Sequence, residues 1–225
     1  MAYKETLSLE QQSLIEKHLA LVIEANKTTN LTRITTPEDA MLLHVEDSLS
    51  GLEEMNEAPE GPYGDLGSGA GYPGIPLAVA TGRKTTLIDA RQKKMAILDE
   101  IIEELDLSNQ VSTYAGRAEL LARKERGHYA VMTARALAKL PVLMELASPL
   151  LKRGGHLICY KANIEESELA HARRVQTATG MKLQKEREFQ LGKNFSRTIV
   201  VFEKEDEPTV KLPRQEGQAQ KHPLE

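Results

Sequence analysis

The stretch DLGSGAGYPGIP, residues 65–76, places four glycines and two prolines within twelve positions. Glycine adopts backbone conformations that other residues avoid, whereas proline fixes its φ angle and has no N–H to donate. Residues 69–74 match the G-x-G-x-x-G fingerprint of dinucleotide-binding proteins. Residues 65–71 form an overlapping pattern, an acidic residue followed by G-x-G-x-G. The loop therefore has two competing interpretations, which differ in where the next helix begins.

Segments rich in strand-forming residues alternate with helical segments from residue 63 onward. The last two segments, 182–191 and 196–204, are separated by a short turn and predict an antiparallel hairpin at the sheet edge. The alternation before them is typical of a doubly wound α/β fold, so we expect a Rossmann-like, seven-stranded, mostly parallel sheet. Strands are expected at 63–66, 84–89, 110–115, 129–135 and 156–161, with helices at 75–81, 91–106, 117–126, 139–152 and 164–179.

The dinucleotide interpretation requires a helix that begins at Gly71, so that its first N–H groups can hold a pyrophosphate. Pro73 and Pro76 oppose that start, because each lacks an N–H and disfavours helical geometry in the residue before it. We expect the helix to begin at Pro76, with proline in its first turn. A start at Gly71 would favour an NAD(P)-dependent oxidoreductase, and a start at Pro76 would argue against it.

The second interpretation is a site for S-adenosylmethionine, a nucleoside cofactor without a phosphate. Closely spaced glycines let the backbone approach such a ligand, and Asp65 offers a carboxylate to its sulfonium and ammonium charges. Asp89, at the end of the second strand, is placed to accept hydrogen bonds from ribose hydroxyls in either kind of site. The prolines and Asp65 therefore favour S-adenosylmethionine. A glycine-rich turn without a ligand is the plain structural alternative, although unused glycines cost stability.

Two helices are expected before the first strand. Ser8 can cap a helix over 8–26, and Thr36 with Pro37 can begin a second one that runs to about residue 52. We therefore divide the chain into an N-terminal helical extension packed on the core (1–60), an α/β domain (61–205) and a polar tail (206–225). The tail contains proline and glycine and few apolar residues, so it is expected to be disordered.

The composition is that of a globular protein, with 225 residues, 40% hydrophobic and 28% charged. No apolar run approaches the ~20 residues that span a bilayer, and the only cysteine, Cys159, has no partner for an internal disulfide. We expect a cytoplasmic monomer without membrane contact, and no metal site, since no His/Cys cluster has ligand spacing. Residues 1–60 carry four Lys and Arg against twelve Asp and Glu, which leaves a net basic remainder that could hold a nucleic-acid backbone.

Several motifs together resemble the RsmG (GidB) family over about residues 14–204. They are the glycine loop continued as DLGSGAGYPGIPLAVA, and TLIDARQKKMAIL, GRAE, TARALAKLP, LLKRGGHLICYK, NLTRI and HVEDSL. The resemblance implies a class I S-adenosylmethionine-dependent methyltransferase that acts on N7 of a guanosine in bacterial small-subunit (16S) ribosomal RNA. Tyr72 stands where the family often has Leu or Phe, and Ala162 stands where glycine is more usual.

The resemblance also implies the cofactor contacts. They fall on Gly67 and Tyr72 in the loop, on Asp89-Ala90, on Ala118-Glu119 in GRAE and on Arg135 in TARA. Together with the loop residues considered above, the candidate cofactor-binding set is Asp65, Gly67, Ser68, Gly69, Gly71, Tyr72, Asp89, Ala90, Ala118, Glu119 and Arg135.

Guanine N7 carries a lone pair and no proton, so the implied reaction requires no general base. Orienting residues on the RNA side are expected at Arg135, Lys161 and Arg197. A rim salt bridge is an equal interpretation of Lys161, and an exposed charge at the sheet edge is the simpler one for Arg197. His44 is a further candidate, although a packing or capping role is the more common one for a single helical histidine.

Two other function classes remain open on sequence alone. The G-x-G-x-x-G match allows an NAD(P)-dependent oxidoreductase, which tight NADH binding would reveal. A non-catalytic RNA-binding ribosome assembly factor could keep the fold without turnover, and the intact glycine loop argues against it.

Overall fold

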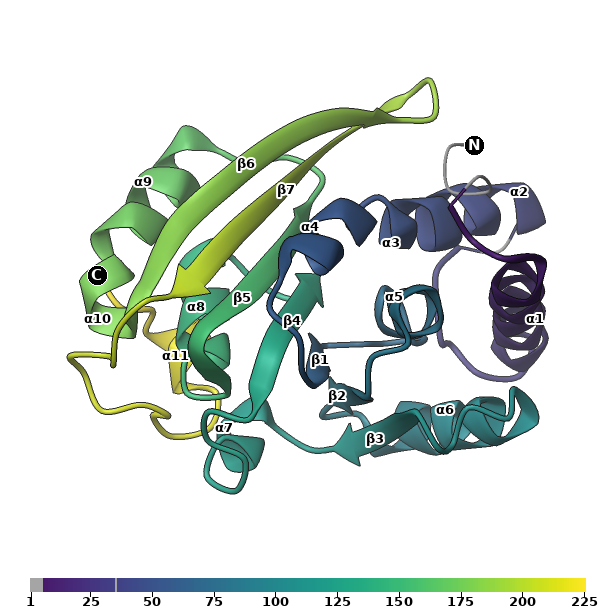
Figure 1. The fold of residues 1–225 in the computed structure, drawn as a ribbon, viewed down its shortest axis with the longest axis horizontal. Coiled ribbons are helices and arrows are strands. Elements are labelled where there is room, and N and C mark those ends of the chain that lie inside the picture. The colour runs from purple at the N-terminus through teal and green to yellow at the C-terminus, as the bar shows by residue number, and fades with distance from the viewer. Residues whose placement is uncertain (1–5, 35) are drawn as a thin grey trace.

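The computed structural model describes residues 6–34 and 36–225. Its sheet has seven strands in the order β3-β2-β1-β4-β5-β7-β6 (Figure 1). Neighbours among the first five strands pair in parallel, and β7 is antiparallel to both β5 and β6. The expected mostly parallel sheet with an antiparallel C-terminal hairpin is confirmed. The strands are β1 Tyr63–Leu66, β2 Thr85–Asp89, β3 Val111–Ala115, β4 Tyr129–Arg135, β5 Leu151–Lys161, β6 Met181–Leu191 and β7 Phe195–Lys204.

Helices cover both faces of the sheet, as the parallel topology requires. On one face α5 (Gly74–Thr81) packs on β1 and β2, and α6 (Gln92–Glu104) packs on β2 and β3. The other face carries α8 (Leu140–Ala147), which packs on β5 and contacts α7 (Ala118–Leu121) and α9 (Glu166–Arg174). The short α10 (Gln176–Thr179) follows α9 and contacts β6.

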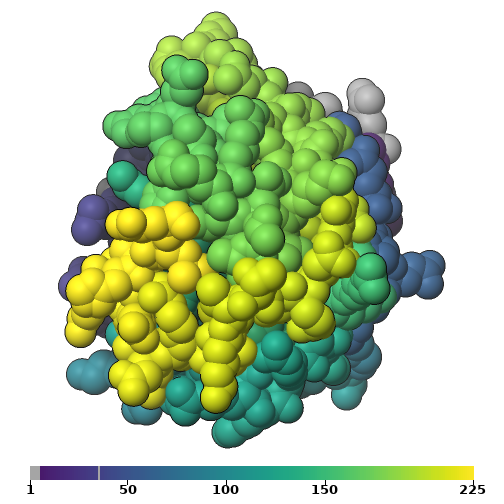
Figure 2. Space-filling view, turned by 90° about the vertical axis from the view of Figure 1, so that its left-hand side faces the viewer, coloured from purple at the N-terminus to yellow at the C-terminus, as the bar shows by residue number. Residues whose placement is uncertain are grey.

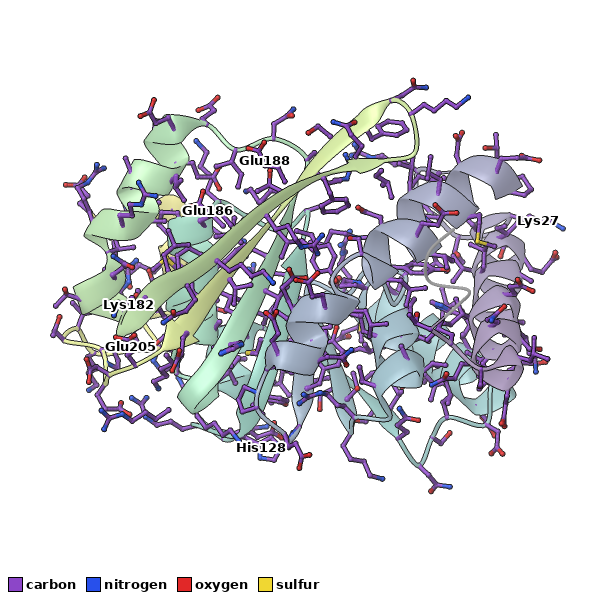
Figure 3. The ribbon with its side chains drawn as sticks, turned by 45° about the horizontal axis from the view of Figure 1, so that its top comes forward. Lys27, His128, Lys182, Glu186, Glu188 and Glu205 are labelled. Carbon is purple, nitrogen blue, oxygen red and sulfur yellow. The ribbon has the colours of Figure 1, made fainter. Side chains whose placement is uncertain are left out.

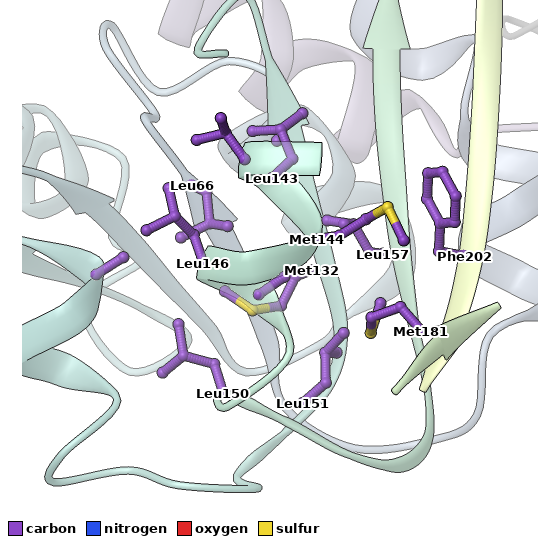
Figure 4. Close-up of a cluster of buried hydrophobic side chains, with 14 of the residues drawn as sticks. Leu66, Met132, Leu143, Met144, Leu146, Leu150, Leu151, Leu157, Met181 and Phe202 are labelled. Carbon is purple, nitrogen blue, oxygen red and sulfur yellow. The ribbon is translucent and has the colours of Figure 1, made fainter. Parts of the chain in front are cut away.

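The strand side chains alternate between these two layers, so consecutive residues enter different hydrophobic clusters. In β4, Val131 packs in the cluster beneath α4 (Leu52–Glu57) and α5, whereas Met132 packs in the one beneath α8. Figure 4 shows the second cluster, where Met144 of α8 lies toward Leu157, and Leu143 and Leu146 of the same helix lie toward Leu66. Cys159 is fully buried in this cluster, and burial raises the pKa of its thiol, so it packs as a small uncharged side chain.

The N-terminal helices lie against the α5 and α6 layer. Ser8 caps the first of them in a reciprocal capping box with Gln11, which confirms the expected start. The second expected helix is broken: after the Thr36 cap its middle turn is π-helical, and Gly51 separates its last part. The elements are α1 Leu9–Asn26, α2 Pro37–Ala40, η2 Met41–Glu46, α3 Asp47–Leu49 and α4 Leu52–Glu57.

The hairpin strand β6 forms the edge of the sheet. Its side chains alternate between exposed and half-buried positions, and the exposed ones include Lys182, Glu186 and Glu188 (Figure 3). Lys182 pairs with Glu205 at 3.0 Å. Charged residues on an edge strand oppose pairing with a second sheet, so this edge is protected.

The segment 206–225 is ordered in the structure, which contradicts the expected disorder. It lies across one side of the molecule (yellow in Figure 2) and contains the short helix α11 (Gln218–Lys221). Two side chains of this segment, Leu212 and Ala219, are buried, and its Arg214 donates to both carboxylate oxygens of the buried Glu145. Its composition suggested too little apolar surface for folding, but two buried side chains and a charge-assisted pair fix it on α8.

The helix after the glycine loop begins at Gly74, two residues before the expected Pro76. The Gly74 N–H donates to Asp65 Oδ2 at 3.0 Å, which satisfies the first donor of the helix. A Cβ at Gly74 would lie 2.2 Å from a Leu87 side-chain carbon, so only glycine allows this close packing of helix on strand. Pro76 is tolerated because the N–H groups of the first turn have no partner within the helix. The helix does not begin at Gly71.

Candidate cofactor and substrate site

A cavity of about 210 Å³ opens at the carboxyl ends of β1, β2 and β3. This is where ligands bind in doubly wound folds. Five of the expected cofactor residues line it, and the sheet brings them together from three separate segments: Gly67, Asp89, Ala90, Ala118 and Glu119.

Two buried carboxylates face this cavity. Asp89, 6% exposed, accepts hydrogen bonds from the Gly69 N–H at 3.2 Å and from the Arg91 N–H at 2.9 Å. The Arg91 guanidinium also pairs with it at 3.2 Å. Glu119, 5% exposed, accepts a hydrogen bond from the Gly217 N–H at 2.8 Å.

The lining of this cavity fits a nucleoside. Carboxylate oxygens can accept hydrogen bonds from ribose hydroxyls, and a ligand pocket combines apolar walls with a few placed polar groups. The apolar walls here are formed by Leu66, Ile88, Leu137 and Leu146.

Only Gly67 of the glycine loop lines this cavity. The other loop residues that were expected to contact the cofactor have a structural role. Gly67, Gly69 and Gly71 have φ angles of 72°, 59° and 87°, in the region that glycine adopts readily. Ser68 is 1% exposed, and its hydroxyl points to the Met95 sulfur at 4.0 Å. The loop residues other than Gly67 therefore shape the backbone beneath the cavity.

Asp65 is fully buried, so the structure does not place its carboxylate against the cavity as expected. Oδ2 accepts from the Gly74 N–H and Oδ1 accepts from the Thr133 hydroxyl at 2.7 Å. Burial raises the pKa of the Asp65 carboxyl from 3.8 to about 6, although these hydrogen bonds and the Arg135 charge oppose the rise. Asp65 thus ties the loop and α5 to β4.

The raised pKa of Asp65 predicts a pH-dependent stability. A group that binds its proton more tightly in the folded state stabilises that state while it is protonated. For Asp65 this stabilisation of the fold is complete below the unfolded pKa, near 4, and it is lost as the pH rises through about 6. Asp65→Asn stays neutral: its carbonyl oxygen can accept from the Gly74 N–H, and its NH2 can donate to the Thr133 hydroxyl oxygen. Its free energy of unfolding relative to wild type should rise by about 2–3 kcal/mol between pH 4 and pH 7, measured by urea denaturation. A difference that stays flat with pH would contradict the prediction.

A second cavity, of about 530 Å³, lies beside the first at the carboxyl ends of β4 and β5. All four residues expected on the RNA side line it, although they come from distant parts of the chain: His44, Arg135, Lys161 and Arg197. Arg135, expected to contact the cofactor, belongs to this cavity.

Asp47, at the start of α3, connects the two arginines of this cavity. Its Oδ2 lies 2.9 Å from an Arg135 guanidinium nitrogen, and its Oδ1 lies 3.0 Å from Arg197 Nε. Arg135 also donates to the Leu43 carbonyl at 2.9 Å. The Arg197 side chain is only 16% exposed, so the interpretation of it as an exposed edge charge is wrong. The N-terminal extension therefore sets the position of both guanidinium groups.

Lys161 forms the salt bridge that the sequence left as an equal possibility. Its ammonium lies 2.6 Å from Glu168, and the Glu168 side chain is 8% exposed. Glu168 also accepts from the Leu140 N–H at the start of α8. Lys161 thus lines the cavity as a paired cation.

The Tyr72 ring lies between two histidines of the N-terminal extension. It stacks on His44 at 4.5 Å and packs on His18 at 4.5 Å. Burial lowers the pKa of His44 to about 4, with the Arg135 charge as the second cause, and it lowers that of His18 to about 3. Both rings are neutral at pH 7. His18 Nε2 must donate to the Ala70 carbonyl, 3.2 Å away, because a carbonyl only accepts.

Tyr72→Phe is predicted to stabilise the fold by about 1 kcal/mol, because the buried Tyr72 hydroxyl has no hydrogen-bond partner within residues 6–34 and 36–225. The phenyl ring keeps the contacts with both histidines. Tyr160→Phe is the matched control, since the Tyr160 hydroxyl donates to the Ser48 carbonyl at 2.8 Å. Its free energy of unfolding should fall by about 1 kcal/mol. Urea denaturation measures both variants, and a clearly lower free energy of unfolding for Tyr72→Phe would contradict the prediction.

One segment after β4 separates the two cavities. Leu137 lines the first cavity, while its neighbours Ala136 and Ala138 line the second. A Cβ at Gly67 would lie 2.8 Å from a Leu137 methyl carbon, so the loop and this segment are in close contact. Ala136 has a φ of 53°, a conformation that costs a non-glycine residue energy and is concentrated at functional sites.

The residues that the sequence missed are Asp47 and His18, both in the N-terminal extension. Asp47 follows His44 by three positions, so both fall on one side of a helix, which was an available signal. No signal placed His18 beside the loop.

Nowhere in 6–34 and 36–225 do three or more His, Cys, Asp or Glu side chains gather as a metal ion requires. The same described part contains no helix with the length and apolarity to cross a bilayer.

Comparisons with known proteins agree with this geometry. The profile of the GidB family, rRNA small subunit methyltransferase G, matches residues 11–199. Ribosomal RNA small subunit methyltransferase G of Leuconostoc citreum is 36% identical over 97% of this chain and 93% of its own length. The Deinococcus radiodurans protein of the same name is 40% identical over 92% of this chain and 83% of its own.

A solved structure shows the same fold. Geranyl diphosphate C-methyltransferase from Streptomyces coelicolor, with S-adenosyl-L-homocysteine bound, has a TM-score of 0.52 and 11% identity, and the match covers 69% of this chain and 78% of that one. This likeness concerns the fold alone. The profile and the near full-length relatives show the family: the chain belongs to the rRNA small subunit methyltransferase G family and is an S-adenosylmethionine-dependent methyltransferase with a class I fold.

Proposed function

We propose that this protein methylates N7 of a guanosine in small-subunit ribosomal RNA, with the cofactor in the first cavity and the guanine in the second. The single observation that supports this most is the shared wall at 136–138, which sets a nucleoside-sized carboxylate site directly beside a cationic cavity. When bound, S-adenosylmethionine supplies an electrophilic methyl group on a sulfonium.

The charged groups of the second cavity suit a reaction without proton abstraction. Guanine N7 offers a lone pair and loses no proton, so it needs alignment with the methyl group and no general base. Asp47 is engaged by Arg135 and Arg197, which leaves it poorly suited to act as a base. The cavity thus holds donors for anionic or carbonyl oxygens.

Arg135 and Arg197 would bind the RNA, because arginine donates to guanine O6 and to phosphate oxygens in paired hydrogen bonds. Specific RNA recognition mostly targets unpaired bases, which can turn out of the strand into a cavity. His44 and Lys161 complete this wall. Asp89 and Glu119 would hold the ribose and the adenine edge on the other side of the wall.

The test combines binding with product analysis. Calorimetry should show S-adenosylhomocysteine binding and no tight NADH binding. Incubation with small ribosomal subunits, or with naked 16S RNA, and a labelled methyl donor should give 7-methylguanosine after nuclease digestion and mass spectrometry. Cofactor binding without any methylated nucleoside on either substrate would favour the assembly-factor alternative. Methylation at another atom would refute the assignment to N7.

We also propose that the protein acts as a monomer in the cytoplasm, where its ribosomal RNA substrate is found. The two cavities are built from one chain, so neither needs a second copy. Light scattering of the purified protein at the concentration of the activity assay tests this. A dimer whose dissociation abolishes methylation would contradict it.

A further inference from the structure

We propose that the C-terminal tail is part of the cofactor site, and that Gly217 is a positioning residue for Glu119. The inference rests on the proposed placement of the cofactor in the first cavity. The Gly217 N–H donates to Glu119 Oε1 at 2.8 Å, and this bond is buried. Gln220, in the next turn of the tail, lines the same cavity as Asp89 and Glu119. The tail therefore lines the cavity with Gln220 and holds one of its carboxylates through Gly217.

The tail is held firmly enough to fix that bond. Arg214 donates from Nε and from a terminal nitrogen to the two oxygens of Glu145, at 2.6 and 2.5 Å, and Glu145 is 3% exposed. The same guanidinium donates to the His222 carbonyl at 2.7 Å, which closes the segment on itself. Arg126 donates to the Leu212 carbonyl at 2.7 Å. Gly217 thus lies between two anchored ends.

The bond gives Glu119 a defined orientation. A carboxylate has several acceptor sites, so the Gly217 N–H uses one and the remainder stays available to hydroxyl or amino donors of a nucleoside. A carboxylate held in one orientation binds such donors more tightly than a mobile one, because less freedom is lost on binding. The ligand class is the nucleoside part of the cofactor.

Two substitutions at one position compare a tail that can place its N–H on Glu119 with a tail that cannot. Gly217→Pro removes the donor and also shifts the backbone at this point, because proline holds φ near −65° and the φ of Gly217 is 72°. Gly217→Asn keeps it, and it suits the site because the φ of Gly217 is 72°, where asparagine is tolerated, and no atom lies within 4 Å of its added Cβ. Calorimetry should show about 10-fold weaker S-adenosylhomocysteine binding for Gly217→Pro and at most twofold for Gly217→Asn. For Gly217→Pro, the KM for the methyl donor should rise, whereas kcat and the KM for RNA should stay unchanged.

A double-mutant cycle tests whether Gly217 acts through Glu119. In a Glu119→Gln background, Gly217→Pro should weaken binding by clearly less than 10-fold, because contacting residues couple. Fully additive effects would overturn the positioning role. If wild type itself fails to bind S-adenosylhomocysteine, the proposed placement of the cofactor fails. If wild type binds and Gly217→Pro binds equally well, only the role of the tail fails.

Hydrogen exchange on the unaltered full chain gives a second test that does not depend on a variant folding. Saturation with S-adenosylhomocysteine should slow exchange of the Gly217 amide at least about 10-fold, because a ligand that requires the closed tail disfavours its opening. The exposed amides at the tip of the β6–β7 hairpin should not change. Unchanged exchange at Gly217 under saturating ligand would overturn the proposal.

Discussion

Arg135→Ala is expected to lower kcat/KM for RNA methylation by about 100-fold or more, because removal of one placed donor from a reaction site has effects of ~10²–10³. Arg135 is 15% exposed in the second cavity, and a second cation of this cavity, Arg197, shares its carboxylate partner Asp47. Affinity for S-adenosylhomocysteine should stay within about threefold, since Arg135 does not line the first cavity. Single-turnover methylation and calorimetry measure the two quantities separately.

Arg135→Lys is the matched control. Arg135 Nη1 donates to both the Leu43 carbonyl and Asp47, so the other guanidinium nitrogens can donate to the RNA. Lysine keeps the charge but has a single donor nitrogen and lacks this planar fork, so it should recover only part of the activity. Thermal melting of both variants checks the fold, because Asp47 keeps Arg197 as its partner in each. Full methylation by Arg135→Ala would contradict the assigned role, and lost cofactor binding would move Arg135 to the first cavity.

Asp89→Ala is expected to weaken S-adenosylhomocysteine binding by at least about 100-fold, because two hydrogen bonds from ribose hydroxyls to a carboxylate contribute ~1.5–3 kcal/mol each and are lost together. The substitution also removes the acceptor of the Gly69 N–H, which loosens the glycine loop. RNA affinity should change little, since Asp89 lines the first cavity and not the second. Calorimetry with the nucleoside product and filter binding of RNA give the two affinities.

Two controls separate the parts of the Asp89 effect. Asp89→Asn keeps an acceptor for the Gly69 N–H but loses the charge, so its binding should lie between wild type and Asp89→Ala. Arg91→Ala removes an exposed side-chain partner of Asp89 and should shift binding by only a few-fold, because a solvent-exposed guanidinium contributes little to an ion pair. Unchanged binding by Asp89→Ala would mean that the nucleoside lies elsewhere.

The sheet and its order of elements could be predicted from the sequence because they depend on local periodicity. Residues 63–66 and 129–135 are strands with the expected bounds, and the hairpin differs from its expected bounds by one residue at the start of each strand. The helix start differs from its expectation for a tertiary reason. Asp65 lies nine residues before Gly74 and accepts a hydrogen bond from the Gly74 N–H. This bond lets the helix begin two residues before the expected Pro76.

Site residues near the ends of strands could be predicted from the sequence. Those whose position depends on contacts between distant parts of the chain were missed. Asp89 and Arg135 are the last residues of β2 and β4, and Glu119 comes shortly after β3, so topology places all three at one edge of the sheet. The burial of Arg197 was missed because its partner Asp47 comes from the other end of the chain. The tail was misjudged because one carboxylate, Glu145, and two buried apolar residues outweigh its polar composition.

Mass spectrometry of 16S ribosomal RNA from cells that lack this protein tests the central claim most directly. The RNA should lack one 7-methylguanosine that is present in RNA from the parent cells. Expression of the wild-type protein should restore it, and expression of Arg135→Ala should not. An unchanged set of methylated guanosines in the mutant cells, or the loss of a methyl group from a different atom, would contradict the account.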